Sequence, residues 1–305
     1  MKFPLSKYIW FDGKLVPVNM AKVPVTTHAI HYGTSIFEGI RAYWNSKNLY
    51  VFRLKDHIKR FRNSGKFYNI KLNFSDRQIE NAVIDLCKKN KIKKSCYIRP
   101  FYFVGQYGIN FHVTQKAPTH TAIFAFPFGD LFNKSGITAT ISKWRKFSDM
   151  STPTQAKMGG NYLNSILATQ DAKQRGFDEA ILLDQSGNVS EAPGENIFLV
   201  KNNMLVTPSL SSSALDGITR RSIITLAKDM KLKIKTQKVS KKELKMADEI
   251  FLSGTAAEIT PVIKIDKKKI GEGKVGNITK LFMDTYSNIV MNKSENYSHW
   301  LTAVY

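Results

Sequence analysis

Alternating hydrophobic and polar positions mark several segments in the first half of the chain. Residues 8–11 and 14–18 are apolar-rich runs on either side of Asp12-Gly13, a dipeptide that tolerates the positive φ of a tight turn, so the pattern predicts a β-hairpin. Residues 96–104 and 120–128 are rich in aromatic and β-branched residues, which is typical of strands. The first half is therefore expected to contain a sheet.

Apolar residues at helical spacing predict helices in both halves. Residues 54–67 and 75–89 fit this pattern, and Ser75 with Gln78 has the spacing of a capping box. In the second half, helices are expected over residues 161–175, ending at Gly176, over 219–228 and over 278–290.

Short apolar runs separated by polar pairs predict consecutive antiparallel strands in the second half. With the helices, these strands indicate a mixed α and β fold class. The runs are residues 180–184, 189–192, 196–201 and 204–207.

A polar, glycine-containing segment at residues 129–136 interrupts the pattern. We expect it to be an interdomain linker between a smaller α/β domain, residues 1–128, and a larger α/β domain, residues 137–305. A chain of 305 residues is long enough for two domains of ordinary size and for a substantial core.

Composition narrows the class of protein further. With 43% hydrophobic and 23% charged residues, the chain fits neither a disordered protein nor a collagen-like or disulfide-rich scaffold. Cys87 and Cys96 lack the paired spacing of a zinc site, so we expect two free thiols in a reduced compartment. Residues 1–7 do not resemble a signal peptide and no run of about 18 apolar residues occurs, so a cytoplasmic protein without a membrane partner is expected.

The chain is strongly basic, with 46 Lys and Arg against 24 Asp and Glu and a net charge of +22. Such a charge favours polyanions, anionic lipid or negatively charged metabolites. The lysines form scattered groups, as at residues 88–94, without an RNA-binding aromatic signature between them. We therefore expect solvated faces and no nucleic-acid partner, and a basic nucleic-acid-binding protein is the alternative from another class.

Several catalytic motifs are missing from the sequence. It has no Walker phosphate loop, no GxGxxG fingerprint and no GxSxG elbow. His28 and His31 lack the intervening Glu and the spacing of HExxH zinc enzymes, so we expect them to pack or hydrogen-bond, and no metal site is predicted.

Lys157 is a lone lysine among small residues, a short distance before the hydroxyl of Tyr162. A lysine buried beside other cations loses its proton easily and can form a Schiff base with a carbonyl. On local sequence alone, an ordinary surface cation is the alternative.

Three further segments could complete such a site. Residues 216–221 and 253–258 could each aim backbone N–H groups and a threonine hydroxyl at a phosphate, although helix capping at Thr219 and an ordinary turn at Gly254 would explain them as well. Residues 190–196 place two acids within an apolar sheet, where a buried carboxylate needs a cationic partner such as a pyridinium nitrogen.

Taken in order, these segments resemble the branched-chain amino acid aminotransferases, fold-type IV enzymes that use pyridoxal phosphate. The resemblance implies a two-domain architecture like that of D-amino acid aminotransferase, and transfer of an amino group between leucine, isoleucine or valine and 2-oxoglutarate. It also implies at least a homodimer, with a hexamer left open. A D-amino acid transaminase and an aminodeoxychorismate lyase are alternatives within the fold. The matching stretches are residues 28–41, 97–100, 156–162, 190–196, 217–220 and 253–258.

The resemblance implies three catalytic residues. Lys157 would hold pyridoxal phosphate as a Schiff base and move the substrate proton, Glu191 would face the ring nitrogen, and Tyr162 would donate to the phenolic oxygen. The residues that match the phosphate cradle are Arg60, Ile218, Thr219 and Thr255.

The resemblance also implies a substrate pocket. Its apolar wall would include Tyr32 from a neighbouring subunit, and a distal glutamate carboxylate would meet Arg99. Departures from the family pattern at residues 105–111, 128–131 and 192–193 put the side-chain preference in doubt. The remaining pocket residues are Phe37 and Gly39 for the wall, and Tyr97, Thr255 and Ala256 for the α-carboxylate.

Overall fold

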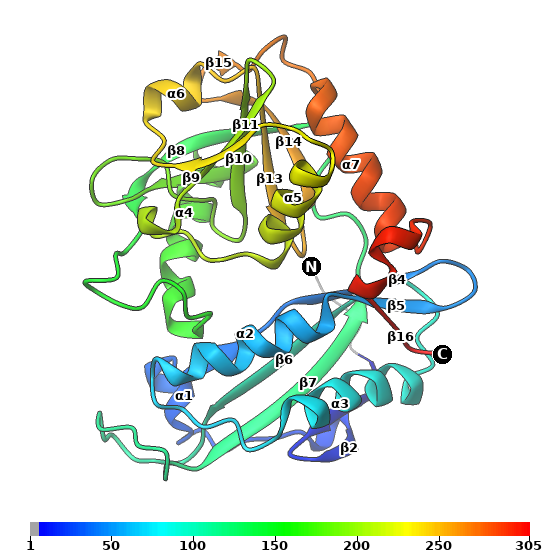
Figure 1. The fold of residues 1–305 in the computed structure, drawn as a ribbon. Coiled ribbons are helices and arrows are strands. Elements are labelled where there is room, and N and C mark those ends of the chain that lie inside the picture. Colours follow the sequence, from blue (N-terminus) through cyan, green and yellow to red (C-terminus); the bar gives the residue numbers. More distant parts are fainter. Residues whose placement is uncertain (1–5) are drawn as a thin grey trace. The chain divides into compact units, whose positions relative to one another are not determined.

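The structure, a computed structural model, describes residues 6–305. Residues 1–5, part of the segment that was compared with a signal peptide, lie outside the described residues. The chain forms two compact units, each with its own sheet (Figure 1). This confirms the mixed α and β class. The first unit comprises Met1–Gly129, Ala156–Gly160 and Asn288–Tyr305, and the second comprises Asp130–Gln155 and Asn161–Ser287.

This division differs from the expected domains in two places. The Lys157 segment and residues 288–305 belong to the first unit, although both were expected in the larger domain at residues 137–305. The reason is strand pairing: the Phe37 N–H donates to the Lys157 carbonyl at 3.1 Å, and the C-terminal strand pairs with a strand of the first sheet.

The first sheet is antiparallel in all its described pairings, with the strand order β16-β5-β4-β6-β7-β1-β2 and with β3 paired to β6. The expected hairpin is confirmed, since Asp12 and Gly13 have φ of 44° and 91° and Phe11 lies opposite Lys14. The strands are β1 (Tyr8–Phe11), β2 (Lys14–Pro17), β3 (Ser35–Phe37), β4 (Ile40–Trp44), β5 (Leu49–Phe52), β6 (Cys96–Val104), β7 (Thr119–Pro127) and β16 (Leu301–Ala303).

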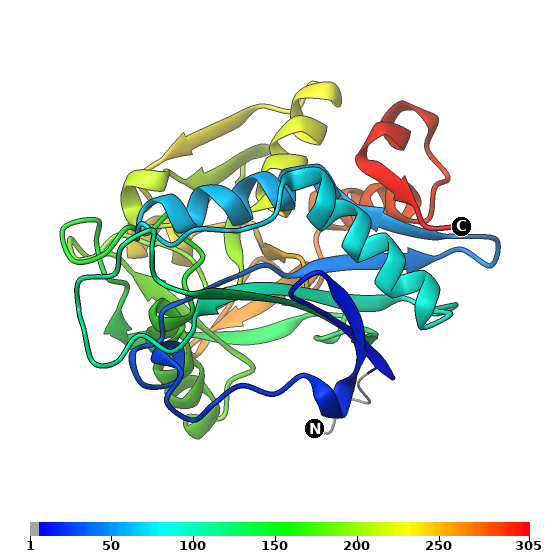
Figure 2. The same cartoon turned by 90° about the horizontal axis from the view of Figure 1, so that it is seen from below.

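Helices α2 (Leu54–Lys66) and α3 (Asp76–Lys89) cover one face of this sheet (Figure 2). The capping box of α3 is confirmed, because Ser75 accepts from the Gln78 N–H and the Gln78 side chain accepts from the Ser75 N–H. The apolar stripe of α3 packs into the core against alternate residues of β6, which leaves the other residues of β6 on the opposite face. The unit also contains α1 (His28–Tyr32), η1 (Val18–Met20) and η4 (Glu295–Trp300).

The second sheet is mixed, with the strand order β12-β11-β10-β13-β14-β8-β9 and with β15 paired to β14. Strand β8 runs parallel to both of its neighbours, β11 runs parallel to β12, and the other described pairings are antiparallel. The strands are β8 (Ile137–Arg145), β9 (Glu179–Leu183), β10 (Asn196–Lys201), β11 (Met204–Pro208), β12 (Ile234–Gln237), β13 (Glu249–Gly254), β14 (Glu258–Ile265) and β15 (Lys268–Lys269).

The expected run of consecutive antiparallel strands is correct only in part. Strands β10 and β11 form the predicted hairpin, but β9 lies at an edge of the sheet and pairs in parallel with β8. Residues 189–192 form no strand and make one isolated bridge, between Val189 and Leu183. The expected pairing with the preceding strand is present over a short stretch, since the Ser190 N–H donates to the Leu182 carbonyl at 2.9 Å and the Leu182 N–H donates to the Glu191 carbonyl at 2.8 Å. It does not continue as a ladder, because the Val189 N–H donates to Val239 and the Ala192 N–H to Glu195.

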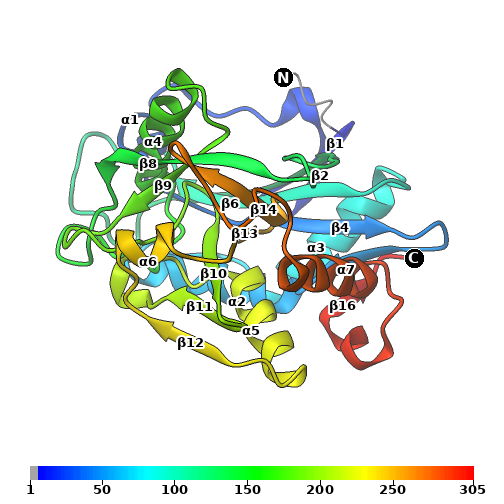
Figure 3. The same ribbon diagram turned by 90° about the horizontal axis from the view of Figure 1, so that it is seen from above.

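The three helices expected in the second half of the chain, over residues 161–175, 219–228 and 278–290, all occur. Helix α4 (Tyr162–Gln174), beside β8 and β9 in Figure 3, ends just before Gly176, whose φ is +80°. Its buried side holds Ala168 and Ala172, whereas Leu163 is 66% exposed. The other helices of this unit are α5 (Ile218–Asp229), α6 (Lys241–Lys245), η3 (Leu210–Ser212) and most of α7 (Asn277–Val290). The short η2 (Gly159–Asn161) begins in the part of the chain that belongs to the first unit.

Two further findings concern the whole described range. Over residues 6–305, no helix has both the length and the apolar character needed to cross a bilayer. Cys87 and Cys96 are free and buried in the core of the first unit.

Candidate functional site

The residues expected to form the site fall into two groups, one in each unit. The first unit holds the group around Lys157, and the second holds the group around Glu191. Each group is described by itself.

Lys157 is held by its backbone at the edge of β3. Its N–H donates to the Ser64 hydroxyl at 3.0 Å, and its carbonyl accepts from the Phe37 N–H. The next residue, Met158, forms an isolated antiparallel bridge with Ile36. The Lys157 ammonium lies 4.9 Å from the centre of the Phe37 ring, so the amine is directed along an aromatic surface.

A buried carboxylate organises the surroundings of this lysine. Glu38 is 0% exposed, and Arg60 donates to both of its oxygens, from Nε to Oε1 at 2.6 Å and from Nη2 to Oε2 at 2.8 Å. His57 Nδ1 lies 2.8 Å from Oε2. Because this fork fixes the plane of the guanidinium, Arg60 is held in one orientation, within electrostatic reach of the lysine.

These charges shift the pKa values of the group. Burial, followed by the Arg60 cation, lowers the pKa of Lys157 from 10.5 to about 8, while Glu38 opposes the shift. Burial alone would raise the pKa of Glu38, but the charge and hydrogen bonds of Arg60 and the bond to His57 hold it well below its usual range. Burial also lowers the pKa of His57. Lys157 therefore has the properties of a nucleophilic amine.

Tyr97 and Arg99 lie on the face of the first sheet that the helices leave uncovered. The Arg99 Nη2 donates to the Tyr97 hydroxyl at 3.1 Å, and the Arg99 guanidinium lies 4.7 Å from the centre of the Phe37 ring. The Arg99 Nε is buried and has no hydrogen-bond partner among the described residues. A Cβ on Gly39 would lie 1.8 Å from the Tyr97 hydroxyl oxygen, so only glycine fits there. Four predicted pocket residues thus meet in one place.

Tyr32 packs elsewhere in the same unit. Its ring lies 4.6 Å from that of His28 and 5.2 Å from that of Phe111. His28 is buried and places one ring nitrogen 2.8 Å from the Thr34 hydroxyl and the other 3.1 Å from the Asn110 carbonyl, which agrees with the expected packing role. The contribution of Tyr32 to a neighbouring subunit stays a prediction.

In the second unit, Glu191 is buried and takes three donors. The Lys146 ammonium contacts Oε1 at 2.8 Å, and Oε2 accepts from Asn196 Nδ2 at 3.1 Å and from the Leu215 N–H at 2.9 Å. The expected buried acid in residues 190–196 therefore has a protein cation as its partner. A carboxylate held in this way has a fixed orientation.

Two of the expected phosphate-binding segments are linked to Glu191 by hydrogen bonds and strand pairing. Asn196 bonds both to Glu191 and to the Leu215 carbonyl, just before α5, and it lies opposite Ser253 in the β10–β13 pair. Helix α5 begins with Ile218 and Thr219 and has no side-chain cap at Gly217, so capping by Thr219 does not occur. Its N-terminal N–H groups can bind an anion.

Residues 255–257 form the tight turn between β13 and β14, with Gly254 opposite Glu258. Thr255 and Ala256 therefore present backbone groups at a hairpin tip. The Ser253 hydroxyl is buried and lacks a hydrogen-bond partner among the described residues. A Cβ on Gly254 would lie 3.1 Å from the Gly194 carbonyl, so the turn lies against the segment that contains Glu191.

Tyr162 is the first residue of α4. One turn later the Ser165 hydroxyl donates to the Pro193 carbonyl at 2.7 Å, which attaches the start of the helix to the Glu191 segment. Tyr162, Glu191, Ile218, Thr219 and Thr255 are thus all carried by elements that contact one another in the second unit.

Sequence reasoning missed the partners of the two central residues. Glu38 stands in an apolar run, as Glu191 does, and the same argument about buried carboxylates could have singled it out. Lys146 gave no such signal, because it lies among other basic residues after β8 and is distinguished only by being 7% exposed.

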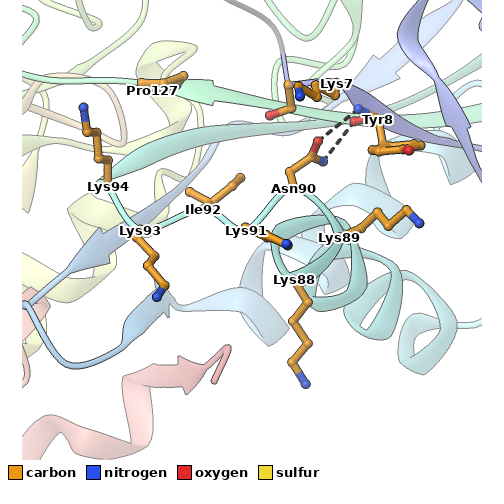
Figure 4. A pocket seen from close by; sticks show the side chains of 11 residues that line it. Lys7, Tyr8, Lys88, Lys89, Asn90, Lys91, Ile92, Lys93, Lys94 and Pro127 are labelled. Atoms are coloured by element: carbon orange, nitrogen blue, oxygen red, sulfur yellow. Dashed lines mark hydrogen bonds between the residues drawn. The ribbon is translucent and has the colours of Figure 1, made fainter.

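A separate concave region of about 900 Å³ lies in the first unit, around the C-terminal end of α3 (Figure 4). Asn90 holds its wall by bonding to both backbone groups of Tyr8. Cations are favourable at a helix C-terminus, so this region fits the expected solvated lysines and holds none of the predicted site residues. None of the lysines in this region forms an ion pair among the described residues. They are Lys7, Lys88, Lys89, Lys91, Lys93 and Lys94.

No group of three or more potential metal ligands occurs among residues 6–305.

Residues 35–265 match the family model of class IV amino-transferases. The branched-chain-amino-acid aminotransferase of Escherichia coli strain K12 is 42% identical over 303 residues, which cover 98% of each chain. The probable branched-chain-amino-acid aminotransferase of Aquifex aeolicus is 41% identical over 302 residues, covering 98% of this chain and 97% of the relative.

Solved structures show the same similarity along the whole chain. The branched-chain aminotransferase from Thermoproteus uzoniensis, solved with norvaline, superposes with a TM-score of 0.95 at 41% identity, covering 98% of this chain and 100% of the other. The branched-chain amino acid aminotransferase from Thermobaculum terrenum, solved in its PLP form, gives a TM-score of 0.93 at 33% identity, covering 99% of each chain.

Proposed function

The chain belongs to the class IV aminotransferases, among the branched-chain-amino-acid aminotransferases, and we propose that it transfers the amino group between leucine, isoleucine or valine and 2-oxoglutarate. Enzymes of this family depend on pyridoxal phosphate. The observation that carries the proposal is a lysine amine, Lys157, whose pKa is lowered to about 8 beside a rigidly held arginine. An amine of this kind can form the Schiff base that the reaction requires.

Both groups of residues suit this cofactor. In the second unit, the uncapped start of α5 and the unpartnered Ser253 hydroxyl offer donors for a phosphate, and Glu191 offers a fixed carboxylate for a ring nitrogen. In the first unit, Arg60 offers a cation with a set orientation. When bound, the cofactor supplies an electron sink that makes the α-proton of an amino acid acidic.

The proposed roles come from the resemblance to the family, and the positions described above support them. Lys157 would hold the cofactor, and its amine would carry the proton to and from the substrate α-carbon. Glu191 accepts from the ring N–H, and Tyr162 donates to the phenolic oxygen. Arg60, Ile218, Thr219 and Thr255 bind the phosphate by side-chain or backbone donors.

Substrate binding is proposed for residues in each unit. On the aromatic face of the first sheet, Phe37 and Gly39 would form the apolar wall and Tyr97 would bind the α-carboxylate; in the second unit, backbone groups at Thr255 and Ala256 are proposed to bind the same carboxylate. Arg99 has a buried Nε donor to spare and would meet the distal carboxylate of glutamate. One pocket could then serve both an apolar and an acidic side chain.

The proposal includes a homodimer in the cytoplasm. Large apolar side chains are exposed on each unit, among them Ile30 and Phe111 in the first and Leu163 and Ile166 in the second, and such side chains are typical of subunit interfaces. Two buried free thiols need no oxidising compartment. Sedimentation at several protein concentrations tests the assembly, and a monomer at all of them would contradict it.

The test of function is the visible spectrum of the purified protein before and after addition of leucine. We expect the absorbance of the lysine-bound cofactor to fall as the amino group is transferred and to return with 2-oxoglutarate. Lys157→Ala should abolish both changes, whereas Lys66→Ala, an exposed lysine of α2, should not. Activity confined to D-alanine or aminodeoxychorismate, or strong salt-dependent nucleic-acid binding without a bound cofactor, would contradict the proposal.

A further inference from the structure

Lys146 is a buried cation outside the residues assigned above. It is 7% exposed, directly follows β8, and its ammonium lies 4.9 Å from the centre of the Phe147 ring. Its backbone is fixed on both sides, since its N–H donates to Leu183 at 2.8 Å and its carbonyl accepts from Gln185 at 2.6 Å. A lysine is rarely buried without a specific partner, and here the partner is Glu191.

The three donors to Glu191 are divided unequally between its oxygens. Asn196 and Leu215 both donate to Oε2, whereas Lys146 contacts Oε1 alone. A carboxylate oxygen accepts about two hydrogen bonds, so Oε2 is filled and Oε1 keeps one site. The acceptor site left to Glu191 is on the oxygen that Lys146 holds.

A second buried cation lies within electrostatic reach. Arg220 is 5% exposed, donates to the Pro208 carbonyl at 3.1 Å, and interacts with the charge of Glu191. Within residues 6–305 the donors to Glu191 do not include Arg220, so this arginine can support the charge of the carboxylate but cannot orient Oε1. Orientation of that oxygen therefore depends on Lys146.

We propose that Lys146 is a positioning residue for the transamination, which holds Glu191 Oε1 in one orientation so that its remaining acceptor site meets the cofactor ring N–H. This rests on the proposed role of Glu191. Lys146 does not touch cofactor or substrate; it acts through the carboxylate. Loss of its contact would leave Glu191 free to rotate, and the ring nitrogen would lose an aligned counter-charge.

The alternative is a purely structural ion pair that keeps residues 190–196 in place. The two roles differ in the quantity that they affect. A purely structural pair changes the stability of the fold and leaves the single-turnover rate constant of the folded enzyme unchanged, whereas a positioning residue changes that rate constant, and only while Glu191 is present to be positioned.

The experiment is a double-mutant cycle on the holoenzyme with Lys146→Met, Glu191→Gln and the double variant. Lys146→Arg tests rescue by a cation, and Lys143→Met, an exposed lysine of β8, is the matched control. Three quantities are measured: the single-turnover rate constant with leucine, the leucine concentration at half-maximal rate, and the pH dependence of the bound cofactor's absorbance. Thermal unfolding reports on the fold, and Lys146→Gln replaces Lys146→Met if the latter does not fold.

We expect Lys146→Met to lower the rate constant about 30-fold, the fall that a coupling of about 2 kcal/mol produces, and to shift the spectral titration. The leucine concentration at half-maximal rate should change little, Lys146→Arg should restore the rate, and Lys146→Met should add nothing in the Glu191→Gln background.

If the rate constant of the double variant falls by the product of the two single reductions, or if Lys146→Met keeps the wild-type rate constant, the positioning role of Lys146 is overturned. Neither result contradicts the proposed role of Glu191. If Glu191→Gln keeps the wild-type rate and spectrum, the assignment of Glu191 in the proposed function fails as well. The two failures are thus told apart by the behaviour of Glu191→Gln.

Discussion

The charges around Lys157 make a prediction with a definite sign for two opposite substitutions. Arg60 lowers the pKa of Lys157 and Glu38 raises it, and the two are bound to each other. Arg60→Met removes the cation and frees the charge of Glu38, so both effects raise the pKa above about 8. Glu38→Gln removes the opposing carboxylate, so the pKa falls further.

The magnitude follows from the wild-type value. With a pKa of about 8, about 9% of the Lys157 amine is uncharged at pH 7, against about 0.03% for a lysine at 10.5, a gain of about 300-fold in reactive amine. A variant in which this pKa rises by about 1 would have about a tenth of the uncharged amine, because the ammonium form predominates at pH 7. The amine becomes more reactive as pH rises through its pKa, since only the uncharged form attacks a carbonyl.

The assay is the rate at which the cofactor-free enzyme reacts with pyridoxal, followed by visible absorbance as pH rises. Pyridoxal lacks the phosphate, so the loss of a phosphate ligand in Arg60→Met does not enter the result. The midpoint of the pH profile should lie near 8 in the wild type, higher in Arg60→Met and lower in Glu38→Gln. Arg62→Met, on the same helix but paired with Asp76, should leave it unchanged.

Midpoints that move in the same direction in Arg60→Met and Glu38→Gln, or a wild-type midpoint near 10.5, would refute this explanation of the reactivity of Lys157. An unchanged midpoint in both variants would do so as well.

Three further predictions concern single buried contacts. Glu38→Gln should lower the free energy of unfolding in urea by about 3–5 kcal/mol, because Arg60 is left as an uncompensated buried charge. Gly39→Ala should lower kcat/KM for leucine about 100-fold, since its Cβ would lie 1.8 Å from the Tyr97 hydroxyl oxygen and displace that ring. Gly217→Ala should raise the dissociation constant of pyridoxal phosphate about 10- to 100-fold, because its Cβ would lie 2.0 Å from the oxygen of the Asn196 amide that binds Glu191.

Each of these has a matched control. Asp76→Asn breaks a partly exposed ion pair and should cost less than about 1 kcal/mol, and Gly129→Ala adds a Cβ with no atom within 4 Å. A stability loss in Glu38→Gln no greater than in Asp76→Asn, or equal kinetic effects of all three glycine substitutions, would contradict the steric and electrostatic reasoning.

The same carboxylate makes stability depend on pH, because the fold lowers the pKa of Glu38 from 4.5. The stabilisation by ionised Glu38 is present above pH 4.5 and is lost as the pH falls through the pKa of the folded state. Glu38→Gln should lack this loss of stability.

Local signals in the sequence predicted most of the individual elements. The capping box at Ser75 and the turn at Asp12-Gly13 depend on neighbouring residues, and both occur as expected. Residues 189–192 look like a strand by composition and pair briefly with Leu182, but the N–H groups of Val189 and Ala192 bond to Val239 and Glu195, which no local pattern shows. The placement of Lys157 with β3 likewise depends on pairing with residues far away in the chain.

The site residues also differ in whether a contiguous sequence motif identifies them or only a contact with a distant segment does. Resemblance to a family identified Lys157 and Glu191, because their surrounding motifs are contiguous. Their partners come from distant segments: Arg60 meets Glu38 across 22 positions, and Lys146 meets Glu191 from the end of another strand. In a chain with 46 basic residues, their low exposure, 10% for the Arg60 side chain and 7% for Lys146, separates these two cations from the solvated ones.

The proposed site residues of both units share one arrangement. Glu38 and Glu191 are both buried carboxylates that take a cation and further donors, and we propose that each supports the orientation of a group that the reaction needs. A buried ion pair contributes little net stability compared with apolar packing, so its retention at two places is better explained by orientation than by folding. The lysines of the concave region near α3 make none of the contacts that hold Lys157 or Glu191. We therefore expect the chemistry to depend on these two carboxylates and their partners Arg60 and Lys146, and not on the lysines of that region.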